Sequence, residues 1–69
     1  MKDLETLDIL DCIDETYETA VHLHRCGIPK KSAVYMLIGY ANAVLDLCGQ
    51  DSVEYEYAEK KVRILKHYL

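Results

Sequence analysis

The sequence predicts an all-α protein, an up-down-up bundle of three helices that dimerises into a larger helical bundle. Apolar residues recur every three or four positions along most of the 69 residues, as on one face of a helix, and the alternation typical of a strand is absent. Most helix-breaking residues fall into two short segments, one at Gly27 and Pro29 and one at Gly49. These segments divide a single domain, residues 1–69, into three helices.

The first helix is expected at residues 3–25 and the second at residues 30–48. Gly27 can adopt the left-handed backbone conformation that closes the first helix. Pro29 suits the first turn of the second helix, where a backbone N–H would have no partner within the helix. The connection between the two helices is short, so we expect them to run antiparallel.

The third helix is expected at residues 52–69. Gly49 can close the preceding helix, and either Asp51 or Ser52 can cap the first turn of the third. Because this connection is also short, the third helix should run parallel to the first.

The apolar faces of the helices are wider than a lone bundle of three helices needs. Projected at 100° per residue, each apolar face covers about 180° or more, whereas packing against neighbours requires somewhat over 100°. An exposed surplus of this kind marks an interface, and a two-fold dimer is the simplest closed solution. We assign to self-association the surplus positions Val53, Tyr57, Ile64 and Tyr68, followed by Ile9, Cys12 and Leu23. In the alternative, the tyrosines only rim the core of the monomer.

Composition narrows the cellular setting and the partners. The formal net charge of −4 argues against direct binding to nucleic acid and favours a basic protein as partner. Three cysteines, at positions 12, 26 and 48, are too few for a secreted disulfide scaffold. The segment MKDLETLDIL lacks the pattern of a signal peptide, and no apolar run is long enough to span a bilayer. We therefore expect a cytoplasmic protein that does not associate with membranes.

Acidic residues are concentrated in the first helix, and basic residues at the opposite pole of the expected bundle. The acids of the first helix form a ridge of Asp8, Asp11, Glu15 and Glu18. The ridge is either a solvated face, as most charge runs are, or a docking surface for a basic protein. Two copies paired antiparallel would set poles of opposite charge together.

The second helix carries a narrow polar side around an unusual glycine. Tyr35, Asn42 and Asp46 lie on this side, which is a candidate surface for a partner, and they surround Gly39. A glycine inside a helix costs about 1 kcal/mol relative to alanine. Close packing in the dimer would explain Gly39, as would the entry of a partner's side chain.

One cluster could begin a metal site. His22 and Cys26 are four residues apart on one helical face, and His67 could approach them from the third helix. This spacing is far less specific than a CxxC or HExxH motif, and no carboxylate pair completes the site. We expect neither a cofactor nor a catalytic centre, because the carboxylates lie on exposed faces and a small bundle leaves little room for a cleft.

These observations favour a non-enzymatic interaction module that self-associates and binds or inhibits another cytoplasmic protein, such as a bacterial regulator or a phage-encoded inhibitor. A structural subunit that acts through oligomerisation is the first alternative. A metal-dependent sensor built on His22, Cys26 and His67 is the second.

Overall fold

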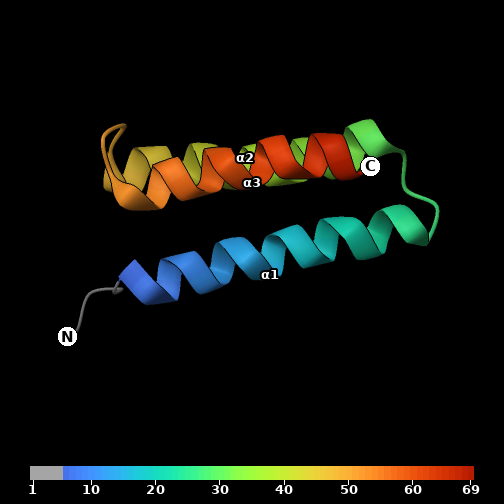
Figure 1. Cartoon of the computed structure of the whole chain (residues 1–69), viewed down its shortest axis with the longest axis horizontal. Coiled ribbons are helices and arrows are strands. Elements are labelled where there is room, and N and C mark those ends of the chain that lie inside the picture. Colours follow the sequence, from blue (N-terminus) through green and yellow to red (C-terminus); the bar gives the residue numbers. More distant parts are fainter. Residues whose placement is uncertain (1–5) are drawn as a thin grey trace.

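The computed structural model describes residues 6–69 as three α-helices and places no strand in that range. They are α1 (Thr6–Arg25), α2 (Lys30–Cys48) and α3 (Val53–Tyr68). The chain runs along α1, returns along α2 and runs again in the first direction along α3 (Figure 1). The predicted all-α, up-down-up arrangement of three helices is therefore confirmed.

The helix limits lie close to those predicted. The end of α1 and both ends of α2 are as expected, and α3 is one residue shorter at each end. The predicted first turn of α1, at residues 3–5, lies outside the described residues. Pro29 differs in detail from the prediction, because it precedes the first turn of α2 and its carbonyl accepts a 3.1 Å hydrogen bond from the Ala33 amide.

Gly27 closes α1 as its sequence position predicts. Its φ of +116° lies in the region that favours glycine. The Ile28 amide then donates to the Leu23 carbonyl at 3.0 Å, and the Gly27 amide donates to the His24 carbonyl at 3.1 Å. This pair of bonds is the Schellman arrangement, and it satisfies carbonyls that the end of a helix otherwise leaves without partners.

At the start of α3, Ser52 is the cap. Its hydroxyl oxygen accepts a 3.1 Å hydrogen bond from the Tyr55 amide. The same hydroxyl donates to the carbonyl of Gly49 at 2.7 Å, which ties the cap to the turn after α2. Of the two caps that the sequence allowed, Ser52 rather than Asp51 has this role.

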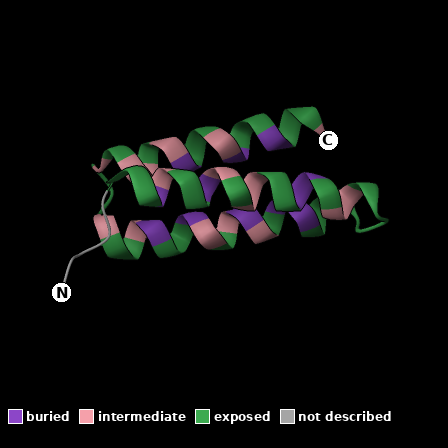
Figure 2. Ribbon diagram, turned by 90° about the horizontal axis from the view of Figure 1, so that it is seen from below, coloured by how far each residue is buried: buried purple, intermediate pink, exposed green. Residues whose placement is uncertain are grey.

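Each helix buries only a stripe of its apolar surface, so exposed residues follow the outer side of all three helices (Figure 2). Several positions of the predicted surplus, among them Val53, Ile64 and Tyr68, lie at the surface of the monomer. Leu47 of α2 is 68% exposed and Val53 of α3 is 66% exposed. Dimerisation itself stays a prediction.

The rotation of α1 differs from the prediction at two positions. Ile9, which we assigned to self-association, is only 7% exposed and belongs to the core of the bundle. The spacing of Leu7 from Leu10 and Ile13 in the sequence predicts a place in the core stripe, but Leu7 is exposed. Ile9, Ile13 and Ala20 lie on one side of the helix at 100° per residue, and this side faces the other two helices.

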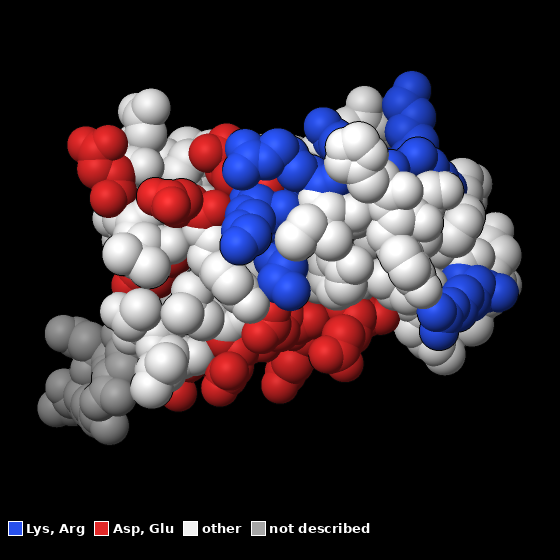
Figure 3. Space-filling model, in the orientation of Figure 1, with Lys and Arg blue, Asp and Glu red and all other residues white. Residues whose placement is uncertain are grey.

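The charges are segregated over the surface (Figure 3). Acidic side chains gather at the end of the bundle where α1 begins and along the side that α1 forms. Basic side chains lie over α3 and at the opposite end. The predicted separation of charge is thus present in the fold.

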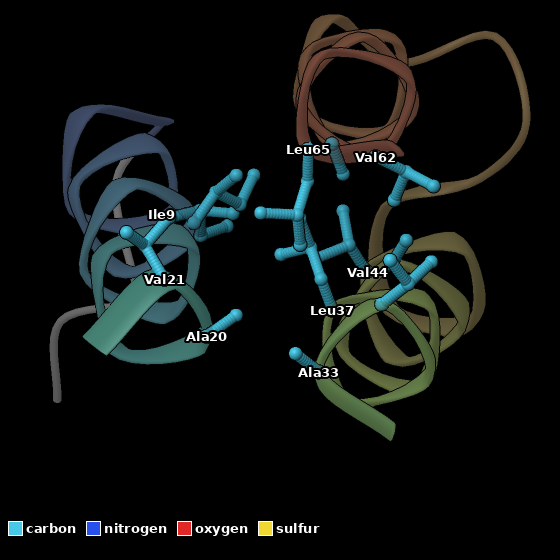
Figure 4. Close-up of a cluster of buried hydrophobic side chains, with 12 residues drawn as sticks. Ile9, Ala20, Val21, Ala33, Leu37, Val44, Val62 and Leu65 are labelled. Atoms are coloured by element: carbon cyan, nitrogen blue, oxygen red, sulfur yellow. The ribbon is translucent and has the colours of Figure 1, made fainter. Parts of the chain in front are cut away.

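The core lies where the three helices face one another (Figure 4). Leu37 of α2 and Leu65 of α3 are fully buried at its centre, as is Ile13 of α1. Ala20 of α1 and Ala33 of α2 point toward each other, and their small side chains allow these helices to approach closely (Figure 4).

Candidate interaction surfaces

An apolar groove lies between the first half of α1 and the second half of α2. It has a volume of ≈ 110 Å³. Its lining residues are Asp8, Ile9, Cys12, Tyr40, Ala43, Val44 and Leu47. We call it the α1/α2 groove. Two buried residues, Ile9 and Val44, contribute to it, whereas Leu47 is largely exposed. Such a groove can receive an apolar side chain from another molecule.

Carboxylates flank the α1/α2 groove. Asp8 lines it directly, and Glu15 is close enough to the Tyr40 hydroxyl that its negative charge helps to raise the pKa of this tyrosine. Burial is the largest cause of this rise, followed by a hydrogen bond with Cys12. Tyr40 therefore reaches from α2 to α1. The groove combines an apolar lining with an acidic edge.

The acidic ridge predicted on α1 is present and fully accessible. Asp8, Asp11, Glu15 and Glu18 are all exposed along this helix. The structure places one member of the ridge, Asp8, in the wall of the groove, and the charge of a second, Glu15, acts on Tyr40. This association of an apolar surface with the ridge depends on how α1 packs against α2, and the sequence pattern alone did not indicate it.

The outer face of α2 exposes the four residues that we expected to meet a partner. Tyr35, Gly39, Asn42 and Asp46 are all accessible, and the Lys31 ammonium lies 6.0 Å from the centre of the Tyr35 ring. A Cβ built at Gly39 meets no atom within 4 Å. Within the described chain, then, no backbone or ring packs closely against this glycine, and its surroundings are open.

The second half of α3 presents a basic face with apolar residues. Lys60, Arg63, Ile64, His67 and Tyr68 line a shallow concavity there. We call these five residues the α3 outer face. Ile64 is 39% exposed and Tyr68 is 57% exposed. The Tyr68 hydroxyl accepts a 2.8 Å hydrogen bond from Arg25, which fixes the ring against the end of α1.

Tyr57, which we assigned to self-association, is used within the chain. Its hydroxyl donates a 2.6 Å hydrogen bond to Asp14 of α1. The Lys61 ammonium lies 3.4 Å from the same carboxylate oxygen, and it is 5.0 Å from the ring centre of Tyr17 and 5.5 Å from that of Tyr57. These four residues form a polar clamp between α1 and α3. The hydroxyl of Tyr57 is therefore used within the chain, and the assignment of this residue to a dimer interface stays a prediction.

The polar clamp shifts the pKa values of two of its members. The hydrogen bond to Asp14 is the largest cause that raises the pKa of Tyr57, and burial raises it further. Burial alone would lower the pKa of Lys61, but the hydrogen bond to Asp14 and the nearby Tyr57 outweigh it, so the net shift is upward. Sequence reasoning missed Asp14 because it belongs neither to the apolar stripe nor to the acidic ridge.

The remaining self-association candidates differ in their surroundings. Cys12 is exposed and contributes to the α1/α2 groove. Leu23 is half-buried, and its carbonyl takes part in closing α1. Val53 is exposed at the opposite end of α3 from Ile64.

The three residues of the candidate metal site are not brought together. Cys26 Sγ lies 3.6 Å from His22 Nε2, as expected for residues one turn apart. Residues 6–69 nevertheless contain no group of three His, Cys, Asp or Glu side chains that could hold a metal ion. His67 lies on the α3 outer face, beside Lys60 and Arg63. This geometry separates it from the pair on α1.

Over the described range, no helix combines the length and the apolar composition needed to cross a bilayer. Comparisons of the chain with protein-family models, with curated proteins and with solved structures found no match. The surfaces described above therefore carry the functional argument.

Proposed function

We propose that this chain is a non-enzymatic protein-interaction module that self-associates and holds a helix with basic flanks in the α1/α2 groove. The observation that carries the proposal is the apolar groove with its acidic edge. Ile9, Val44 and Leu47 supply apolar surface, and Asp8 and Glu15 supply negative charge. An amphipathic helix with an apolar stripe between lysines or arginines complements both features.

Several observations support a binding role. The acids of the ridge are exposed on α1, so they can meet a partner without disturbing the core. Leu47 and Cys12 are also exposed beside apolar neighbours, and burying them would gain roughly 25 cal/mol for each Å² removed from water. In this proposal the partner is a cytoplasmic protein that the module regulates or inhibits, and the acidic ridge steers its approach.

A designed peptide tests the groove directly. The probe is a fluorescent helical peptide with leucine at every third or fourth position and lysines on either side of that stripe. We expect it to bind the wild-type chain in fluorescence anisotropy, and to bind the Leu47→Asp variant at least about tenfold more weakly, as for a contact worth 1.4 kcal/mol.

Two controls separate specific binding from general attraction to an acidic protein. A peptide with glutamates in place of the lysines should not bind, because like charges would face each other at the groove. The Ser32→Asp variant adds the same charge in the exposed first turn of α2 and should bind the lysine peptide as the wild-type chain does. Equal losses of peptide binding in Leu47→Asp and Ser32→Asp would show that the groove is not the binding site.

A structural subunit is the second candidate function, and one observation favours it. The α3 outer face combines Ile64 and Tyr68 with Lys60 and Arg63, so the chain itself carries a basic helix with exposed apolar residues. A protein that supplies both a groove and a matching helix can assemble with itself. Peptide binding distinguishes the two, since a structural subunit should assemble with itself but bind no foreign helix tightly.

A further inference from the structure

We propose that the α1/α2 groove of one copy receives the α3 outer face of a second copy, so that copies of this chain associate head to tail. The inference rests on the proposed function, because it names the helix that occupies the same groove. It differs from the two-fold dimer expected from the sequence, in which both copies use the same surface.

Charge is the first argument for this pairing. Asp8 lines the groove and Glu15 is exposed further along α1, whereas Lys60 and Arg63 flank the apolar residues of the α3 outer face. The groove is built from the start of α1 and the end of α2, at the acidic end of the bundle (Figure 3). The α3 outer face lies toward the basic end. Docking one on the other therefore places opposite charges together.

The two surfaces also match in length. Ile64 and Tyr68 are one helical turn apart, about 6 Å at 1.5 Å per residue. Asp8 and Cys12, which line the α1 side of the groove, are separated by the same turn. The two apolar side chains of α3 can thus contact the groove while the basic residues beside them meet its acidic edge.

Other exposed apolar residues are poorer occupants. Leu7 follows directly before Asp8, and Val53 precedes Glu54 in a first turn that also holds Glu56. Both lie at the acidic end of the bundle. If either docked in the groove, carboxylates would face carboxylates, which opposes association. Tyr35 has Lys31 as a basic neighbour on α2, but it is a single exposed ring, whereas Lys60 and Arg63 flank two exposed apolar side chains on α3.

The positions of the surfaces determine the kind of assembly. Viewed along the bundle, the three helices form a triangle (Figure 4). The groove is lined by residues of α1 and α2 and by none of α3, whereas the residues of the α3 outer face are exposed on the third helix. The two surfaces thus lie on different parts of the molecule. A copy bound through its groove keeps its α3 outer face available, so association continues into open chains or closes into a ring.

Sedimentation equilibrium of the whole chain tests the assembly. The wild-type chain should show an average mass that rises with concentration past that of a dimer, or a ring of more than two copies. Ile64→Asp changes the α3 outer face, and Leu47→Asp changes the groove. Each should weaken association at least about tenfold, equivalent to 1.4 kcal/mol. Ser32→Asp, at an exposed residue of α2 outside both surfaces, should associate as the wild type does.

Mixing the two variants gives the decisive measurement. Ile64→Asp retains an intact groove, and Leu47→Asp retains an intact α3 outer face. Each alone should be monomeric, whereas an equimolar mixture should form a one-to-one dimer that grows no further. Circular dichroism of each variant should show unchanged helix content, because both positions are exposed in the monomer.

Three results would overturn the inference. They are a wild-type chain that stays monomeric at about 1 mM, a limiting dimer of wild-type copies, and a mixture of the two variants that stays monomeric. If the lysine peptide still binds the groove in any of these cases, the proposed function survives without the head-to-tail assembly. If the mixture dimerises but the peptide does not bind, the head-to-tail assembly is supported, and the proposal that the groove binds foreign helices is contradicted.

Discussion

The Tyr57 hydroxyl of α3 donates a 2.6 Å hydrogen bond to the Asp14 carboxylate of α1, 43 residues earlier in the chain. The Lys61 ammonium approaches the same carboxylate oxygen at 3.4 Å and lies over the rings of Tyr17 and Tyr57. This polar clamp joins the first and last helices of a bundle whose core is small. Its contribution to folding can be measured separately from any association.

Tyr57→Phe should lower the free energy of unfolding by about 1 to 2 kcal/mol. The variant removes a hydrogen bond to a charged acceptor but keeps the ring, and solvent reduces the effect because Asp14 is partly exposed. Urea denaturation followed by circular dichroism measures the change. Tyr35→Phe, at an exposed ring on α2, should leave the unfolding midpoint unchanged. In a double-mutant cycle with Asp14→Ala, a coupling energy near zero would contradict the role of the clamp.

Stability should fall as the pH rises above about 10. The pKa values of Tyr57 and Lys61 are raised in the folded state, the first chiefly by the hydrogen bond to Asp14. A group whose folded pKa is raised contributes stability that is complete below its unfolded pKa, about 10 for both residue types, and that is lost as the pH passes the folded pKa. Urea midpoints measured between pH 8 and pH 11, values chosen to bracket this range, should fall at the alkaline end.

The same titration has an internal control. Burial also raises the pKa values of Tyr40 and Tyr55. Tyr57→Phe should therefore flatten the alkaline loss only in part. An identical loss in the variant and the wild type would show that Tyr57 does not contribute to it.

Gly39→Ala should stabilise the monomer by about 0.5 to 1 kcal/mol, because alanine loses less conformational entropy in a helix than glycine. A Cβ at this position meets no atom within 4 Å, so no clash offsets the gain. The measurement is thermal unfolding at low protein concentration. Gly49→Ala is the matched control and should destabilise, since Gly49 has a φ of +93°. A loss of stability at Gly39 would instead indicate that another molecule packs against this glycine.

Ser52→Ala should cost about 1 kcal/mol, because the Ser52 hydroxyl caps the first turn of α3 through the Tyr55 amide. Thermal or urea unfolding detects the change. Ser32→Ala, in the exposed first turn of α2, should have little effect or stabilise slightly, since alanine is the better helix former. If both substitutions had the same effect, the cap would not stabilise α3.

The sequence predicted the helices better than it predicted their surfaces. Gly27 and Gly49 marked two helix ends correctly. The chain has a positive φ at both positions, which glycine adopts without a steric clash. Ile9 and Tyr57, which we assigned to self-association, make contacts within the chain instead, because Ile9 is buried in the core and Tyr57 bonds to Asp14. When the apolar arc of a helix is wide, several rotations of the helix fit the pattern equally well. The sequence could not select among them.

Of the candidate surfaces, too, the sequence predicted one and not the other. The acidic ridge from Asp8 to Glu18 was visible in the sequence, since residues three or four apart share one side of a helix. The α1/α2 groove was not, because it arises where Cys12 of one helix meets Tyr40 of another.

By itself, the sequence determined where the helices run and how the charges are distributed along them, because helix ends and charge positions depend on residues close together in the chain. Only the tertiary structure decided the rotation of each helix about its axis. Packing around Ile13, Leu37 and Leu65 set these rotations together, since all three side chains must be excluded from water at once. That choice brought Asp14 to Tyr57 and left Leu47 and Ile64 on the surface.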